Sequence, residues 1–62
     1  MDKLVAKPGD KIHCKGVTIE IDIIYYQDYY PREGWDIEFD DTTGHYRRWK
    51  QYQDGGELIP KK

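Results

Sequence analysis

The 62-residue sequence has three side chains that bind soft metals or act as nucleophiles and bases: His13, Cys14 and His45. A zinc site needs three or four such ligands at spacings like Cys-x-x-Cys or His-x₃₋₅-His, and neither spacing occurs here. His13 and Cys14 are adjacent, so in a strand they point to opposite faces. We therefore expect no metal site and no cofactor.

Cys14 is the single cysteine, and the sequence contains no serine. A reactive cysteine needs a nearby cationic or basic group that lowers its pKa. Lys15 and His13 are neighbours in sequence but would project across the sheet from it. Ile12 would share its face, so Cys14 is expected to be a small buried hydrophobe. The sequence therefore predicts no enzymatic activity.

Aromatic side chains are the most informative part of the composition. They make up 15% of the chain, whereas disordered segments are poor in them, so the chain is expected to fold. Tyr25, Tyr26, Tyr29 and Tyr30 are too many to bury in so small a core, and tyrosine is enriched at binding surfaces. With Trp35 they are expected to hold a protein, a peptide or a second copy of the chain. The alternative is that they cap a barrel and cover a bent strand.

A second candidate surface combines basic and aromatic residues near the end of the chain. Platforms for single-stranded nucleic acid pair stacked rings with a cationic track. The net charge is -2, and phosphate binding needs uncompensated positive charge. Nucleic acid is therefore the less favoured alternative partner. Its candidate residues are Tyr46, Arg47, Arg48, Lys50 and Tyr52.

Length and composition limit the class of protein. A chain of 62 residues allows one domain, spanning 1–62. Isoleucine and valine outnumber leucine and alanine, which favours an all-β fold. No apolar run is long enough to span a membrane, and the first residues do not have the pattern of a secretory leader. Because a single cysteine allows no internal disulfide, and disulfides are typical of oxidising compartments, we expect a cytoplasmic protein.

Alternation of apolar and polar residues predicts five strands. They cover about 11–15, 17–30, 35–40, 45–53 and 57–59, between a lead-in at 1–10 and a solvated tail at 60–62. In the second strand, Val17, Ile19, Ile21 and Ile23 are expected in the core. A bulge or bend is expected from residue 24 onward, where both faces carry large residues.

The third and fourth strands are expected to form a hairpin with a three-residue loop at 42–44. Gly44 would take the left-handed position that such a loop requires. Favourable cross-strand pairs support this register. The register pairs Asp41 with His45, Phe39 with Arg47, Glu38 with Arg48, Ile37 with Trp49 and Asp36 with Lys50.

Five short strands with a long, bent second strand predict a small five-stranded antiparallel barrel, with an OB-like barrel or an open antiparallel sheet as alternatives. The residues Lys7-Pro8-Gly9-Asp10-Lys11-Ile12, the hairpin 35–41 with Gly44, and the short last strand resemble SH3-like barrels of the KOW or Tudor type. The chain is also similar to short bacterial barrel proteins. The resemblance covers about residues 7–60. It implies an aromatic groove for extended peptides or a tyrosine cage for a methylated cation.

Overall fold

The computed structural model describes residues 5–61, whose strands form one antiparallel sheet in the order β4-β3-β2-β1-β5. Its elements are β1 (Lys11–Cys14), β2 (Val17–Tyr30), β3 (Gly34–Asp41), β4 (Tyr46–Lys50), α1 (Gln51–Asp54) and β5 (Glu57–Ile59). The prediction of a five-stranded all-β domain is confirmed. The closed barrel is wrong: β4 and β5 are free edges, so the sheet is open, as in the alternative prediction. Residues 1–4 of the expected lead-in and Lys62 of the tail lie outside the described residues.

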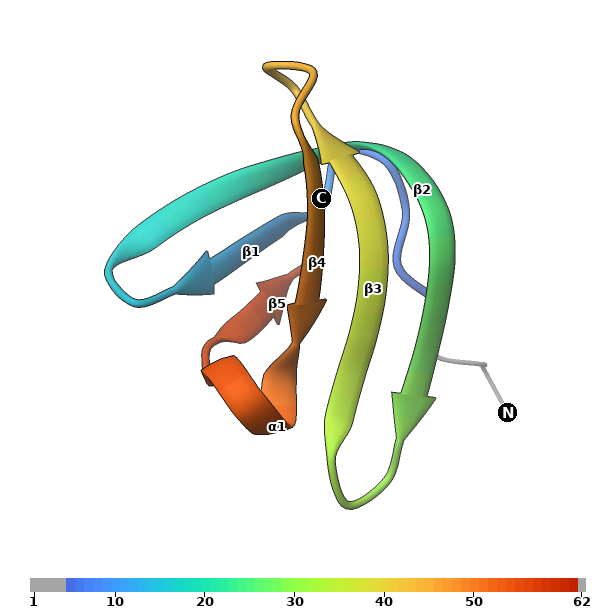
Figure 1. Ribbon diagram of the computed structural model, residues 1–62, viewed down its shortest axis with the longest axis vertical. Coiled ribbons are helices and arrows are strands. Elements are labelled where there is room, and N and C mark those ends of the chain that lie inside the picture. Colours follow the sequence, from blue (N-terminus) through green and yellow to red (C-terminus); the bar gives the residue numbers. More distant parts are fainter. Residues whose placement is uncertain (1–4, 62) are drawn as a thin grey trace.

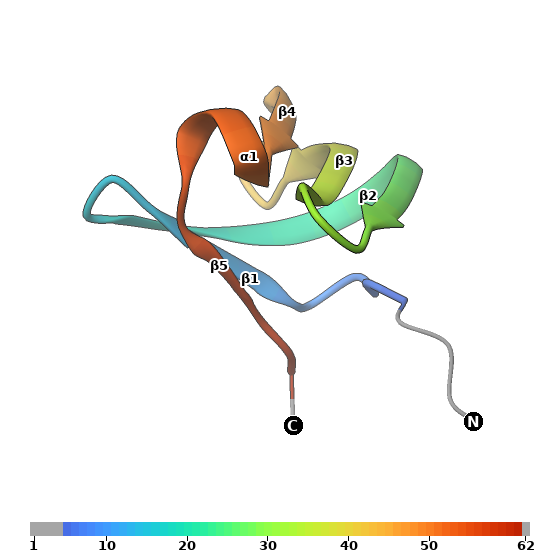
Figure 2. The ribbon, with the colours of Figure 1, turned by 90° about the horizontal axis from the view of Figure 1, so that it is seen from below.

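One long strand serves both halves of the sheet (Figure 1). Residues 17–20 of β2 pair with β1, and residues 21–30 pair with β3. The strand bends between these two parts, so β1 and β5 lie over one side of the β2–β4 layer (Figure 2). The core fills the space between them.

Two irregularities in β2 change which side chains face the core. The pairing with β3 shifts between Ile21 and Ile23, and again between Ile24 and Tyr26. A bulge places two residues opposite one, so Ile24 packs against the core while Ile23 is 47% exposed. The predicted bulge is confirmed but begins earlier, and the prediction that Ile23 is buried is wrong. Val17, at the start of β2, is also 55% exposed rather than buried.

The β3–β4 hairpin has the predicted register at every predicted pair. The Asp41 N–H donates to the His45 carbonyl at 3.0 Å, and the Gly44 N–H donates to the Asp41 carbonyl at 3.0 Å. Gly44 has a φ of 86°, in the left-handed region that glycine adopts without strain. Local turn chemistry and cross-strand charge pairs therefore predict this part of the fold correctly.

β4 ends at Lys50, and the chain then forms the helical turn α1. The prediction that the strand continues to Gln53 is wrong. The Gln51 side chain accepts a hydrogen bond from the Trp35 N–H at 3.2 Å and donates one to the Gly56 carbonyl at 2.9 Å. The Trp49 indole N–H donates to the Gly55 carbonyl at 2.9 Å. These bonds stabilise the turn, which carries the chain away from β4 toward β5.

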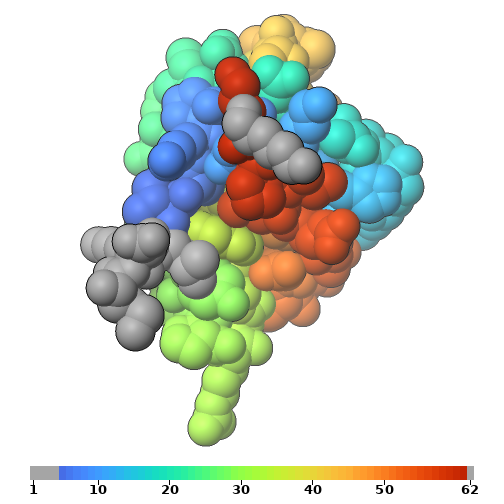
Figure 3. Space-filling view, turned by 180° about the vertical axis from the view of Figure 1, so that it is seen from behind, coloured from blue at the N-terminus to red at the C-terminus, as the bar shows by residue number. Residues whose placement is uncertain are grey.

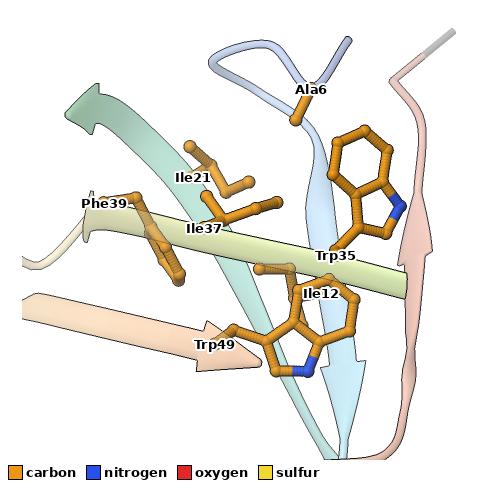
Figure 4. Packing of buried hydrophobic residues seen from close by; sticks show 7 residues of the cluster. All are labelled: Ala6, Ile12, Ile21, Trp35, Ile37, Phe39 and Trp49. Atoms are coloured by element: carbon orange, nitrogen blue, oxygen red, sulfur yellow. The ribbon is translucent and has the colours of Figure 1, made fainter. Parts of the chain in front are cut away.

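The core forms where the two halves of the sheet meet (Figure 4). Its buried apolar residues are Ala6, Ile12, Ile21, Trp35, Ile37, Phe39 and Trp49. β3 contributes three of them, Trp35, Ile37 and Phe39. Ala6 was not expected there. The Gln27 side chain holds it, accepting from the Ala6 N–H at 2.7 Å and donating to its carbonyl at 2.9 Å.

A buried carboxylate joins the segment before β1 to the end of the chain. Asp10 accepts hydrogen bonds from the main-chain N–H of Lys7 at 2.9 Å and of Lys61 at 2.8 Å. The space-filling view shows the C-terminal segment crossing this side of the molecule beside residues 5–10 (Figure 3). The described parts of the lead-in and the tail are therefore packed into the domain.

Candidate interaction surface

The outer face of β2–β4, turned away from β1 and β5, brings four tyrosines together. Phe39 points into the core, so its neighbours Glu38 and Asp40 point outward. The Tyr25 hydroxyl donates to Asp40 at 2.7 Å, and the Tyr46 hydroxyl donates to Glu38 at 2.6 Å. The Tyr26 and Tyr30 hydroxyls lie 3.4 Å apart. We call this surface the tyrosine face and define it by Tyr25, Tyr26, Tyr30 and Tyr46.

The rings of this face remain accessible although their hydroxyls are bonded. The ring centroids of Tyr25 and Tyr46 lie 6.2 Å apart, with the planes tilted by 41°. Both tyrosines are 58% exposed. Each hydroxyl is held by a carboxylate beneath it, which fixes the ring and leaves part of its surface open to a ligand.

Hydrogen bonds raise the pKa of three tyrosines on this face. The hydrogen bond to Asp40 raises the pKa of Tyr25, and the hydrogen bond to Glu38 raises the pKa of Tyr46. Tyr30 also has a raised pKa, first through its hydrogen bond with Tyr26 and then through Asp28. Tyrosine hydroxyls are protonated at neutral pH, and those of Tyr25 and Tyr46 act as donors to these carboxylates.

Two cations on β4 border the tyrosine face, and one of them is strongly engaged. Arg48 donates to both carboxylate oxygens of Asp36, at 3.2 and 3.1 Å, and lies 3.5 Å from Glu38. The bond to Asp36 raises the pKa of Arg48. Lys50 is opposite Asp36 in the register. With Asp28 and Asp40 also nearby, the face keeps an excess of negative charge.

The structure separates the five residues predicted as a partner site. Tyr29 lies on the other face of the sheet, where its ring meets Trp35 edge-on with centroids 5.0 Å apart. Trp35 is buried and belongs to the core. The exposed cluster therefore keeps Tyr25, Tyr26 and Tyr30 and gains Tyr46. Strand alternation between β3 and β4 could have placed Tyr46 beside Glu38 and Asp40.

The five residues predicted for nucleic acid are divided among three places. Arg48, Lys50 and Tyr46 lie on the outer face, whereas Arg47 lies on the inner face, with its Nε 2.6 Å from Asp41. Tyr52 is on α1. The structure thus assembles no continuous cationic track from these residues, because strand alternation sends adjacent arginines to opposite faces.

Asp41 gives the hairpin a testable pH dependence. Its carboxylate accepts hydrogen bonds from the hydroxyl and N–H of Thr43, from Arg47 and from the His45 N–H. These bonds, that of the Thr43 hydroxyl first, hold the pKa of Asp41 well below its usual value. The native state therefore favours the carboxylate, which adds stability above the unfolded-state pKa of about 4.

We expect the free energy of unfolding to fall as the pH drops below about 4 toward the lower native pKa. In Asp41→Asn, that fall should be shallower, and stability at pH 7 should be reduced because the charged acceptor is lost. Urea denaturation of both proteins from pH 7 to pH 2 measures the difference. Equal pH slopes for the two proteins would show that Asp41 does not carry this dependence.

Cys14 and the histidines make local structural contacts. The half-buried Cys14 thiol donates to the Asp54 carbonyl at 3.4 Å. His13 Nδ1 lies 2.9 Å from the Thr18 hydroxyl, and His45 Nδ1 lies 2.9 Å from that of Thr43. Among residues 5–61, no three His, Cys, Asp or Glu side chains form a group that could hold a metal ion.

Comparison with known proteins gives no family for this chain. No protein-family model, curated protein or solved structure matches it. Within the described part of the chain, no helix is long and apolar enough to cross a membrane. The exposed surfaces of the domain therefore carry the information about its function.

Proposed function

We propose that this domain is a noncatalytic interaction module whose tyrosine face binds a protein or peptide segment with cationic side chains. The observation that carries the proposal is the accessible Tyr25–Tyr46 pair, anchored on Asp40 and Glu38. Aromatic faces attract Lys and Arg side chains through cation–π interactions. The neighbouring carboxylates also attract cationic side chains electrostatically.

The fold is compatible with the resemblance to SH3-like domains. The proposed binding surface, however, differs from the aromatic groove or cage that this resemblance implies. A bent second strand shared by two sheet halves fits the resemblance described above. The proposed surface lies on the outer side of β2–β4 and does not use Trp35. A methylated cation is thus only one member of the class of ligands that this surface would accept.

A capped hexapeptide of alternating arginine and glycine tests the proposal. Titrated into ¹⁵N-labelled protein at low ionic strength, it should give saturable shifts at the tyrosine face, whereas a glutamate–glycine peptide should not. Tyr46→Ala should weaken binding about two- to fivefold. Tyr52→Ala is the matched control, because Tyr52 is 57% exposed but lies on α1, and it should leave the affinity unchanged.

Two results would reject the proposal. One is an equal effect of the two tyrosine substitutions. The other is an arginine–glycine peptide that shifts only residues outside the tyrosine face or does not bind. Titration with oligothymidylate at low and physiological salt tests the alternative, because phosphate contacts predict a steep loss of affinity with salt.

A further inference from the structure

The open sheet leaves a groove beside its β4 edge, on the side opposite the tyrosine face. A hollow of about 280 Å³ lies between the β1–β2 hairpin and β4, with Cys14, Val17, Ile19 and Trp49 in its lining. A second hollow of about 200 Å³ extends it to Thr42 and Thr43 in the β3–β4 turn. Both hollows share Val17, Ile19 and Arg47, so together they form one channel along β4, which we call the edge groove.

The main chain of β4 borders this groove with unused hydrogen-bonding groups. Asp41 and His45 form a hydrogen-bonded pair, so the pairs Phe39–Arg47 and Ile37–Trp49 continue the bonds to β3. The N–H and C=O groups of Tyr46, Arg48 and Lys50 must then point to the free edge. Arg48 lines the groove although its guanidinium is bound to Asp36 on the outer face, which places its main chain at the groove.

We propose that the edge groove is a second binding site, which takes an extended peptide segment of a partner protein as an added strand on β4. Peptide recognition by strand addition uses main-chain hydrogen bonds for affinity and pockets for alternate side chains for specificity. An inward side chain opposite Trp49 would lie over the apolar hollow. Val17, an exposed apolar residue of its lining, would be covered by this contact.

Charge on the β4 edge selects the chemistry of that segment. The outward neighbours of an added strand would be Arg48 and Lys50. Arg48 is already bound to Asp36, whereas Lys50 forms no salt bridge among residues 5–61, so an acidic side chain opposite Lys50 would make a favourable cross-strand pair. A second copy adding its own β4 in antiparallel register around Arg48 would oppose like charges, which is unfavourable. The segment that fits has an aliphatic residue opposite Trp49 and an acidic residue beside it, opposite Lys50.

A capped heptapeptide of alternating glutamate and valine is the probe. It should bind saturably to ¹⁵N-labelled protein, shift the amides of Tyr46, Arg48 and Lys50, and slow their hydrogen exchange. The same peptide N-methylated at alternate residues cannot donate along one edge and should bind at least about tenfold more weakly. A lysine–valine peptide should also bind more weakly than the glutamate–valine peptide.

Two substitutions of exposed aliphatic residues in β2 form a matched pair. Val17→Gln removes an apolar contact from the groove without adding a charge and should weaken peptide binding about fivefold. Ile23→Gln makes the same kind of change at a residue of similar exposure outside the groove lining and should leave peptide affinity unchanged. Chemical-shift spectra of the free variants check that both remain folded.

Several outcomes of these peptide experiments would overturn the proposal. These are no saturable binding at millimolar peptide, equal binding of the N-methylated peptide, an equal effect of the two substitutions, and shifts confined to the tyrosine face. A dimer that forms without peptide in sedimentation, with the amides of Tyr46, Arg48 and Lys50 protected from hydrogen exchange, would also overturn it. The arginine–glycine peptide, which tests the other face, gives a separate result.

Discussion

Replacing Gly56 by alanine should remove most of the stability of this domain. Gly56 has a φ of 91°, and an added Cβ would overlap the His13 carbonyl oxygen and lie 2.9 Å from Cys14 Cβ. The left-handed backbone costs an L-residue roughly 1–2 kcal/mol, and overpacking costs roughly 1–3 kcal/mol more. A chain of this length has a total stability of roughly 3–9 kcal/mol. We therefore expect a loss of about 2–5 kcal/mol, which is most of the total at the lower end of that range.

The clash with β1 cannot be relieved by moving a flexible side chain. The contacted atoms include the main chain of β1, and His13 pairs with Glu57 in β5. Gly16→Ala provides the control, because Gly16 has a φ of 77° and an added Cβ would meet nothing within 4 Å. Urea denaturation should show a loss of only about 1–2 kcal/mol for the control. Similar losses for both variants would mean that the close approach at Gly56 does not matter.

Replacing Ile37 by alanine is expected to have a comparable effect for a different reason. Ile37 is 0% exposed and lies at the centre of the core. Truncation of a fully buried isoleucine typically costs about 2–5 kcal/mol, because apolar contacts are lost and a cavity remains. The loss can be measured by urea denaturation followed through the fluorescence of Trp35 and Trp49.

Ile23→Ala is the informative control for this experiment. The apolar alternation in β2 predicts that Ile23 is buried, whereas the structure exposes about half of it. Its truncation should change the free energy of unfolding by no more than about 0.5 kcal/mol. A loss as large as that of Ile37→Ala would show that the bulges in β2 are placed incorrectly.

The part of the fold that the sequence predicts correctly is the part that short-range chemistry decides. The turn at 42–44 has a glycine at the left-handed position, and the hairpin pairs opposite charges and apolar residues in only one register. These signals lie within about fifteen residues of one another. The same reasoning failed for the end of β4, because the bonds of Gln51 to Trp35 and Gly56 come from residues outside the strand pattern.

The sequence predicts only part of the candidate site. The excess of tyrosine in residues 25–30 correctly indicates exposed rings, because the core has no room for them. Which rings share a face depends on the bulges, whose positions the sequence does not specify. The structure therefore places Tyr29 against Trp35, away from the other three tyrosines, and brings Tyr46 to their face. The edge groove could not be foreseen, since it exists only because the sheet stays open.

The second bulge of β2 reverses the change in side-chain direction that the first bulge introduces. A regular strand in phase with Ile21 would turn Tyr25 inward and Ile24 outward. The first bulge shifts this phase by one residue, and the second restores it, so only the short stretch between them is inverted. Gln27 keeps its place beside Ala6, and Ile24 rather than Tyr25 enters the core. Loss of one bulge alone would turn Asp28 toward the interior, so the two must be kept or lost together.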